Sequence, residues 1–298
     1  MFKSLIRTFA IVAAFIAGYM MPGLHVYSWM FKWMLIVMLF VTFLGIRFKR
    51  MKPERAHWLL TGANLMVALA AWGVCRLVFG DGYLAQAAFF VGIMPTATAA
   101  PVVMGLLGGS VEFMLTALLL INGIICALLP FILPAVVGRG GFEIYLNVAQ
   151  NISLVMLLPL ALALAARRFY PRAIAWPRKL QDVTFGIWVV ILVLIAANAS
   201  YDISSREGIS ERVLEQIGVI ALLVCGVNFG LGYLLGGRTR AAECSQALGQ
   251  KNTTLSIYLA LTYASPIAAL GPTFYVLWHN LWNAWQLYRA SERKRRDG

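Results

Sequence analysis

Ten apolar segments, each long enough to cross a bilayer as a helix, follow one another along the 298 residues of the chain. A helix needs about 20 apolar residues to span the hydrocarbon core, whereas a membrane barrel shows alternating polarity in segments of about 10 residues. The pattern therefore predicts an all-α membrane protein with about ten transmembrane helices and short loops. The segments lie at residues 4–22, 28–47, 57–79, 83–107, 110–138, 143–166, 183–203, 210–236, 240–265 and 267–289.

The composition is typical of the same class. Hydrophobic residues make up 61% of the chain and charged residues only 12%, against roughly 25% charged residues in soluble domains. The formal net charge of +13 could suggest a nucleic-acid ligand. However, the basic residues form short blocks between apolar segments rather than one face. We therefore expect the lipid bilayer as a partner and no nucleic acid.

The basic blocks also predict an orientation. They follow the second, sixth, eighth and tenth segments, while most of the opposite connections carry few charges. Since Lys and Arg concentrate in cytoplasmic loops, we expect a multi-pass protein of the plasma membrane, the inner membrane of a bacterium, with both termini in the cytoplasm. These basic residues are Arg47, Lys49, Arg50, Lys52, Arg55, Arg167, Arg168, Arg172, Arg178, Lys179, Arg238, Arg240, Arg289, Arg293, Lys294, Arg295 and Arg296.

The second half of the chain repeats the pattern of the first. A shift of about 152 residues places segments two to five on segments seven to ten. Two halves with an odd number of spans, joined in series, cross the membrane in opposite senses, which is the topology of an inverted repeat. We therefore expect two inverted five-helix repeats, residues 1–140 and 141–298, within a single membrane unit.

The fourth and ninth segments are both interrupted in their middle. In the fourth, Pro95 and Pro101 bracket Thr96 and Thr98, and each proline removes a backbone donor and clashes with the preceding turn. The ninth contains the polar run GQKNTT at 249–254. Breaks at corresponding positions of two repeats are the best sequence indication of a transport site at the bilayer midplane.

Lys251 is the residue that most needs an explanation. A lysine at the bilayer centre costs between ~3 and ~15 kcal/mol, depending on the method. It is either part of a site, or a lysine whose long side chain reaches the membrane surface. The hydroxyl and amide neighbours could bind substrate or ion, or only satisfy backbone groups freed by the breaks. The candidate site residues are Thr96, Thr98, Gln250, Lys251, Asn252, Thr253 and Thr254.

Isolated polar residues in other segments are weaker candidates. Asn64 and Asn122 lie in the middle of the third and fifth segments. For both we favour an interhelical hydrogen bond, which contributes about 0.6 kcal/mol in membranes. In the sixth and seventh segments, Gln150, Asn151 and Asn198 could contact a substrate.

Several motifs resemble the bile acid:sodium symporter family. They are PTATAAPVVMGLLGG at 95–109, PFILPAVV at 130–137 and ALGQKNTTLSIYLALTYASPIAALGPTFYVLWHN at 247–280, which ends in the family's Trp-His-Asn with His279 and Asn280. The chain is most similar to a divergent bacterial-type member. The resemblance implies a panel domain of spans 1, 2, 6 and 7. It also implies a core domain of spans 3–5 and 8–10, in which broken helices 4 and 9 cross. Members of this family carry organic anions, coupled to sodium ions behind the crossing.

The resemblance fails at the sodium ligands. With the register aligned on Gly249 and Asn252, the family's glutamate falls on Ala247 and its glutamine on Lys251. A hard cation needs several oxygen ligands, and the region has lost its carboxylate in this register. Glu243, one turn earlier, could replace it if the register differs. The other ligand positions fall on Ala100, Pro101, near Met114 and Leu118, and near Ala63 with Asn64 beside it.

The ammonium of Lys251 could occupy the place of a bound sodium ion. The lysine would then be a fixed positive charge or a group that loads and unloads a proton. The resemblance thus implies a secondary active transporter of a small organic anion, working by alternating access. Its coupling would be sodium-independent or to H⁺. The alternatives are a receptor or scaffold on the same fold, and a Na⁺ symporter with shifted ligands.

An enzyme is not expected. The chain has no HExxH motif, no carboxylate pair within the spans and no nucleophile beside a base. We assign no cofactor and no metal ligand, apart from a coupling ion.

Overall fold

The computed structural model describes residues 13–45, 51–80, 82–205 and 211–296. The expected segment 4–22 and the basic loop after the second segment lie partly outside these residues. The chain divides into two compact units. Unit 1 contains residues 1–47 and 129–209, and unit 2 contains residues 48–128 and 210–298.

Within the described residues, five helices are long and apolar enough to cross a membrane. The expectation of an all-α membrane protein is thereby confirmed. Two shorter apolar helices are α2 (Met30–Leu44) and α4 (Tyr83–Ile93). The five long helices are α3 (Arg55–Phe79), α6 (Val111–Val136), α7 (Phe142–Phe169), α9 (Gln181–Ser205) and α10 (Glu211–Gly249).

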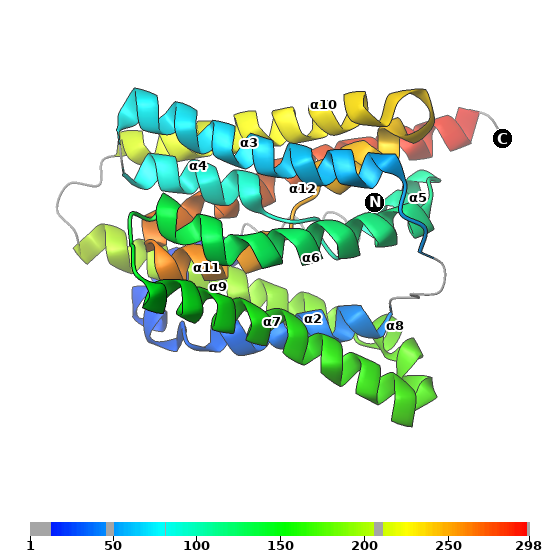
Figure 1. Cartoon of the computed structure of the whole chain (residues 1–298), viewed down its shortest axis with the longest axis horizontal. Coiled ribbons are helices and arrows are strands. Elements are labelled where there is room, and N and C mark those ends of the chain that lie inside the picture. Colours follow the sequence, from blue (N-terminus) through cyan, green and yellow to red (C-terminus); the bar gives the residue numbers. More distant parts are fainter. Residues whose placement is uncertain (1–12, 46–50, 81, 206–210, 297–298) are drawn as a thin grey trace. The chain divides into compact units, whose positions relative to one another are not determined.

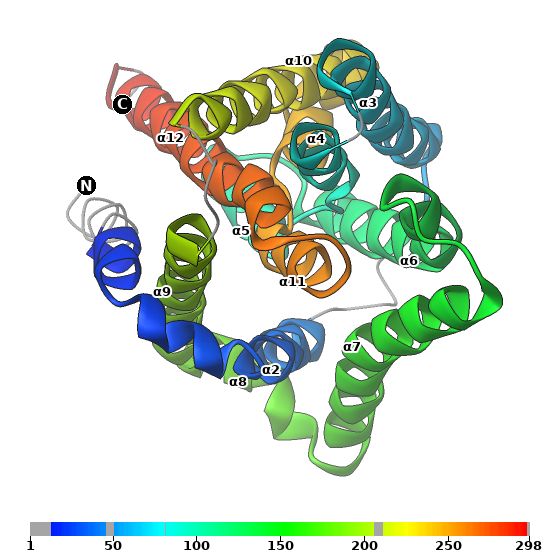
Figure 2. The ribbon, with the colours of Figure 1, turned by 90° about the vertical axis from the view of Figure 1, so that its left-hand side faces the viewer.

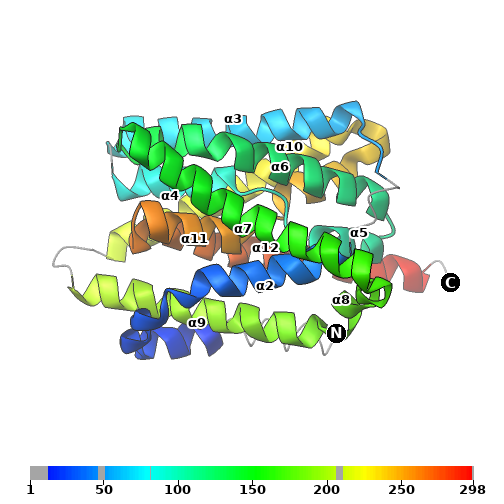
Figure 3. The same ribbon diagram turned by 60° about the horizontal axis from the view of Figure 1, so that its bottom comes forward.

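In unit 1, α2 packs against both α7 and α9 (Figure 3). Leu35 and Leu39 lie one turn apart on the buried face of α2, because residues four apart share one side of a helix. A short helix, η1 (Pro22–Tyr27), precedes α2 and packs on α9. The helices η3 (Pro171–Ala175) and α8 (Trp176–Lys179) connect α7 to α9.

Unit 2 is built around one buried helix, α4 (Tyr83–Ile93). Figure 2 shows α4 enclosed by α3, α10, α11 (Thr253–Tyr263) and α12 (Pro266–Arg296). Phe89 and Phe90 of α4 are fully buried. This fits a helix that is apolar on every side, since such helices lie inside a protein or a membrane. The unit also contains α5 (Ala100–Leu107) and the first part of α6.

Helix α10 is bent back on itself. Gly237 has a φ of 56° and Arg240 a φ of −129°, so neither residue is helical. Residues 211–236 and 241–249 form two helices that pack side by side, with Gly236 against Ala241 and Gly232 against the Cys244 carbonyl. Small residues four apart allow such close approach. The bend lies where the sequence predicts the end of the eighth segment.

An ionic cluster holds this bend. Arg240 contacts Glu54 at 3.0 Å and Glu243 at 3.6 Å. Its guanidinium also lies over the Phe113 ring, 5.0 Å from the centroid. The Glu243 carboxylate accepts a hydrogen bond of 3.1 Å from the backbone N–H of Ser110. The cluster therefore joins the starts of α3 and α6 to the bend of α10.

Candidate site at two adjacent helix breaks

The first break separates α4 from α5. Helix α4 ends at Ile93, and Met94 leaves the helical region with φ −47° and ψ 126°. Helix α5 begins at Ala100 with Pro101 in its first turn. A proline is tolerated there because that N–H has no helical partner. The interruption predicted from the prolines is therefore present at residues 94–99.

The second break separates α10 from α11. Helix α10 ends at Gly249, and α11 begins at Thr253. Asn252 caps α11, because its side-chain oxygen accepts a hydrogen bond of 3.4 Å from the Leu255 N–H. Asparagine is among the preferred residues at this position. The interruption predicted from the polar run therefore falls on residues 250–252.

The two breaks lie side by side and pair with each other (Figure 1). Thr96 and Lys251 form an antiparallel bridge. The Ala97 N–H donates to the Gln250 carbonyl at 2.8 Å, and the Asn252 N–H donates to the Pro95 carbonyl at 2.7 Å. In a membrane every backbone polar group needs a protein partner. Each break therefore supplies one backbone donor and one backbone acceptor to the other.

Lys251 is buried at this point, with 1% of its surface exposed. Its ammonium donates to the side-chain oxygen of Asn64 and, at 3.3 Å, to the carbonyl of Gly92. The Asn64 amide donates in turn to the Ile93 carbonyl at 3.2 Å. Both carbonyls belong to the C-terminal end of α4, where the helix dipole places partial negative charge. Lys251 thus occupies a site that favours a cation.

The partners of Lys251 are neutral. The sequence has no Asp or Glu between residues 244 and 291, and only Asp81, which lies outside the described residues, between 56 and 107. A buried charge is normally paired with an opposite charge or held by several dipoles. Here amide and carbonyl dipoles hold the charge. Neither of the recorded hydrogen-bond partners of the Lys251 ammonium is a carboxylate.

The hydroxyl of Thr96 has a structural partner. Thr96 is fully buried, and its hydroxyl donates to the Ala247 carbonyl at 2.7 Å. This bond ties the first break to the last turn of α10. Thr98, two residues on, is only partly buried. The two threonines, equal candidates by sequence, therefore stand in different environments.

The remaining candidates of the polar run are buried beside the start of α11. Thr253 and Thr254 lie in its first turn. Within the described part of the chain, the side-chain oxygen of Gln250 and the amide nitrogen of Asn252 have no hydrogen-bond partner. An unpaired buried polar group costs about 1–3 kcal/mol. Asn252 therefore offers a free donor next to the positive end of a helix dipole.

The weaker candidates are placed elsewhere. Glu243 binds Arg240 and the Ser110 backbone at the bend of α10. His279 packs edge-on against Tyr275, with ring centroids 5.5 Å apart. Asn280 donates to the Val276 carbonyl of its own helix at 2.7 Å. Asn122 is buried, and its oxygen lacks a partner among the described residues. Of the five secondary candidates, only Asn64 has a recorded contact with Lys251.

Three residues that pack around the second break were not predicted from the sequence. The Tyr275 hydroxyl donates to the Gly249 carbonyl at 2.7 Å, and Ser256 donates to the Phe90 carbonyl at 2.7 Å. The Phe229 ring fills the space beside Gly249, where an added Cβ would lie 2.3 Å from a ring carbon. These residues are ordinary in composition, so their role comes only from packing.

Unit 1 contains a basic residue that was not predicted to be part of a site. Lys32 of α2 donates to the side-chain oxygen of Asn151 at 2.9 Å, and Asn151 donates to the Asn147 side chain. Lys32 could have been identified as a candidate from the sequence, because it is the one lysine within the apolar segment 28–47. Asn198 accepts a hydrogen bond of 2.8 Å from Ser28. Gln150 is exposed in the structure.

No protein-family model matches the chain, and no curated protein matches it significantly. The function is therefore inferred from the geometry of the paired breaks and the residues that surround them.

Proposed function

We propose that the protein is a secondary active transporter of a small organic anion, in which the ammonium of Lys251 takes the place of a bound cation. One observation carries this proposal. Lys251 is buried where two helix breaks pair, and its ammonium binds Asn64 and the Gly92 carbonyl. Intramembrane ionisable residues are functional by default, since their burial costs several kcal/mol.

The paired breaks support the transporter class. Discontinuous helices at matching points of two repeats form the binding sites of many secondary carriers. Residues 94–99 and 250–252 occupy such points under the shift of about 152 residues. Their mutual hydrogen bonds support the proposal that helices 4 and 9 of a ten-helix inverted repeat cross at these points. Unit 2 also contains the segments expected for a core domain, except residues 129–138 of the fifth, and unit 1 contains those expected for a panel domain.

The charges around the breaks support an anionic substrate. The N-terminus of α11, with the free amide nitrogen of Asn252, offers hydrogen-bond donors and a partial positive charge. Helix N-termini bind carboxylates and phosphates for this reason. Lys251 adds a full positive charge, and neither of its hydrogen-bond partners is a carboxylate. A bound anion would complete the charge balance that the protein leaves open.

The residues at the expected sodium-ligand positions support sodium independence. Ala247, Ala100, Met114 and Leu118 are buried and have no side-chain oxygen. Sodium, a hard cation like calcium, takes oxygen ligands. An ammonium held by Asn64 needs fewer of them. The lysine would then act either as a permanent charge or as the group that carries a coupled proton.

Uptake by purified protein in liposomes tests the proposal. A thermal-shift screen of small carboxylates first identifies a substrate. Uptake is then measured with an inward sodium gradient and with an inward proton gradient. We expect uptake without sodium in the wild type, and its loss in Lys251→Ala. Lys179→Ala, which removes an exposed lysine at the end of α8, is the matched control and should transport normally.

The outcomes separate the alternatives. Uptake driven by protons and lost in Lys251→Ala makes the lysine the coupling group, and uptake that ignores both gradients makes it a fixed charge. Uptake that requires sodium would contradict the proposal and indicate a sodium symporter with shifted ligands. Binding of the carboxylate with no uptake or counterflow would indicate a receptor or scaffold.

A further inference from the structure

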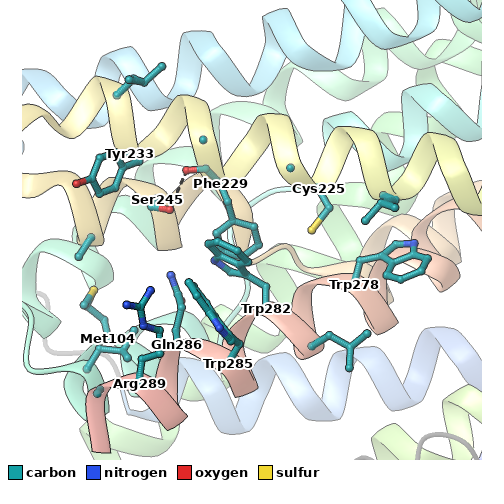
Figure 4. Close-up of a pocket in the computed structure, with 18 residues that line it drawn as sticks. Met104, Cys225, Phe229, Tyr233, Ser245, Trp278, Trp282, Trp285, Gln286 and Arg289 are labelled. Atoms are coloured by element: carbon teal, nitrogen blue, oxygen red, sulfur yellow. Dashed lines mark hydrogen bonds between the residues drawn. The ribbon is translucent and has the colours of Figure 1, made fainter. Parts of the chain in front are cut away.

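A groove of about 1220 Å³ lies in unit 2 between α10 and α12 (Figure 4). Ligand pockets usually measure about 300–1,000 Å³, so this one has room for a large ligand. Its walls are mainly apolar, with Trp278, Trp282 and Trp285 from α12 and Phe229 from α10. None of residues 94–99 or 250–252 lines it, although Phe229 lines the groove and also packs against Gly249.

The groove follows one side of α12. Trp278, Trp282, Trp285 and Arg289 are spaced by four, three and four residues, which places them on one helical face. At 1.5 Å per residue they extend over ~16 Å, and the hydrocarbon core is ~30 Å thick. The groove is therefore about as long as one leaflet of a bilayer is deep.

One end of the groove is polar and positively charged. Arg289 and Gln286 line this end (Figure 4). The Arg289 guanidinium lies over the Trp285 ring, 5.0 Å from its centroid. From residue 289 to residue 296 the sequence has five basic residues and one acidic residue, Glu292. The groove thus combines a long apolar wall with a cationic end.

We propose that this groove binds an anionic phospholipid. One acyl chain would lie along the tryptophans, and the phosphate would bind Arg289. The apolar walls match an acyl chain, and the sign of the charge at the end matches a phosphate. A guanidinium can bind a phosphate through two parallel hydrogen bonds, and basic residues beside a membrane helix attract anionic lipids. The proposal is independent of transport activity.

Quenching of tryptophan fluorescence by brominated lipids tests the proposal. The full chain is placed in phosphatidylcholine liposomes that contain either brominated phosphatidylglycerol or brominated phosphatidylcholine at the same mole fractions. We expect the anionic lipid to quench at lower mole fraction, with an apparent affinity about fivefold higher, the factor that corresponds to ~1 kcal/mol per basic residue. Equal quenching by the two lipids would overturn the proposal.

Variants of the groove residues show whether the anionic lipid binds in the groove. Trp282→Phe with Trp285→Phe removes two reporters from the groove and should remove most of the preferential quenching. Arg289→Gln should abolish the preference for the anionic lipid. Arg238→Gln is the matched control, because Arg238 is exposed at the bend of α10 and does not line the groove. An equal loss in Arg238→Gln would indicate general attraction to a basic surface and contradict a specific site.

A soluble competitor separates a lipid from a free anion. Inorganic phosphate is added at constant ionic strength to the wild type with brominated phosphatidylglycerol. We expect the quenching to be unchanged, because the acyl chain supplies most of the contact. Reversal by phosphate would show a site for a soluble anion and overturn the lipid assignment.

Discussion

The ammonium of Lys251 hydrogen-bonds the side-chain oxygen of Asn64, which lies 187 residues away in the sequence. This bond connects the second break to α3, beside the end of α4. Because the bond is charged and buried, the effect on stability of mutating one partner should depend on whether the other is present. Removing either leaves a polar group without its partner, and such a group costs more than the loss of a neutral surface contact.

A double-mutant cycle measures this dependence. Lys251→Met and Asn64→Leu are compared singly and together in thermal or denaturant unfolding. We expect Lys251→Met with Asn64→Leu to be less destabilising than the sum of the two, with a coupling energy of about 1.5–3 kcal/mol, as for hydrogen bonds to charged groups. Coupling near zero would mean that the lysine is not held by Asn64 in the membrane.

Thr96 and Thr98 should respond differently to the same change. Thr96→Val removes the hydroxyl that binds the Ala247 carbonyl, so we expect a loss of about 1–3 kcal/mol in stability. Thr98→Val acts on a partly buried side chain and should leave the melting temperature nearly unchanged. A stable Thr98→Val variant with weaker substrate binding would assign Thr98 to the substrate. Equal destabilisation of both variants would contradict the distinction.

Close packing in the bent helix α10 predicts a sensitive glycine. A Cβ at residue 232 would lie 2.4 Å from the Cys244 carbonyl oxygen, whereas a Cβ at residue 230 would meet no atom within 4 Å. We expect Gly232→Ala to destabilise by about 1–3 kcal/mol, the usual cost of overpacking, and Gly230→Ala to be neutral. Thermal unfolding in detergent measures both. Tolerance of Gly232→Ala would mean that residues 211–236 and 241–249 do not pack as closely as described.

The ionic cluster at the bend should weaken in high salt but not in alkaline solution. The Glu54 carboxylate accepts a hydrogen bond from Arg240 and raises the pKa of that guanidinium above its ordinary, already high value. A raised pKa adds stability that is lost only when the pH rises through the folded-state value. The contribution is therefore not lost as the pH rises from neutral into the alkaline range.

The size of this contribution should be small. The side chains of Arg240 and Glu54 are 33% and 42% exposed, and exposed ion pairs contribute about 0–1 kcal/mol. We expect Arg240→Gln to cost less than ~1 kcal/mol, and less still at high salt. A pH scan and a salt scan of the melting temperature test this. A loss of several kcal/mol would show that the cluster is a structural lock.

The positions of both breaks could be predicted from the sequence. Pro95 cannot donate a backbone hydrogen bond, and a run of polar side chains around Lys251 cannot continue an apolar helix. Those constraints are local, so they can be recognised in a single sequence. That a buried lysine needs polar partners could also be predicted, because it holds for any buried charge.

The identity of those partners could not be predicted. The Gly92 carbonyl is a backbone group with no signal in the sequence, and Asn64 was one of several isolated amides. The contact of Phe229 with Gly249 and the tryptophan groove depend on how α10 and α12 pack. Such contacts join residues far apart in the chain, and periodicity within one helix carries no information about them.

Whether Lys251 replaces a bound sodium ion is best decided by the sodium dependence of thermal stability in the purified wild type. The melting temperature is compared in sodium and potassium salts of equal ionic strength. A bound ion stabilises the folded state by ~2.7 kcal/mol when its concentration is 100 times its dissociation constant. Ala247→Glu with Lys251→Gln, which puts back the carboxylate and amide expected for a sodium site, serves as the comparison. We predict no difference between the two salts for the wild type, because the Lys251 ammonium already occupies the cation position, and specific stabilisation by sodium in the double variant. Sodium-specific stabilisation of the wild type would show that Lys251 does not replace the ion, regardless of the result for the double variant.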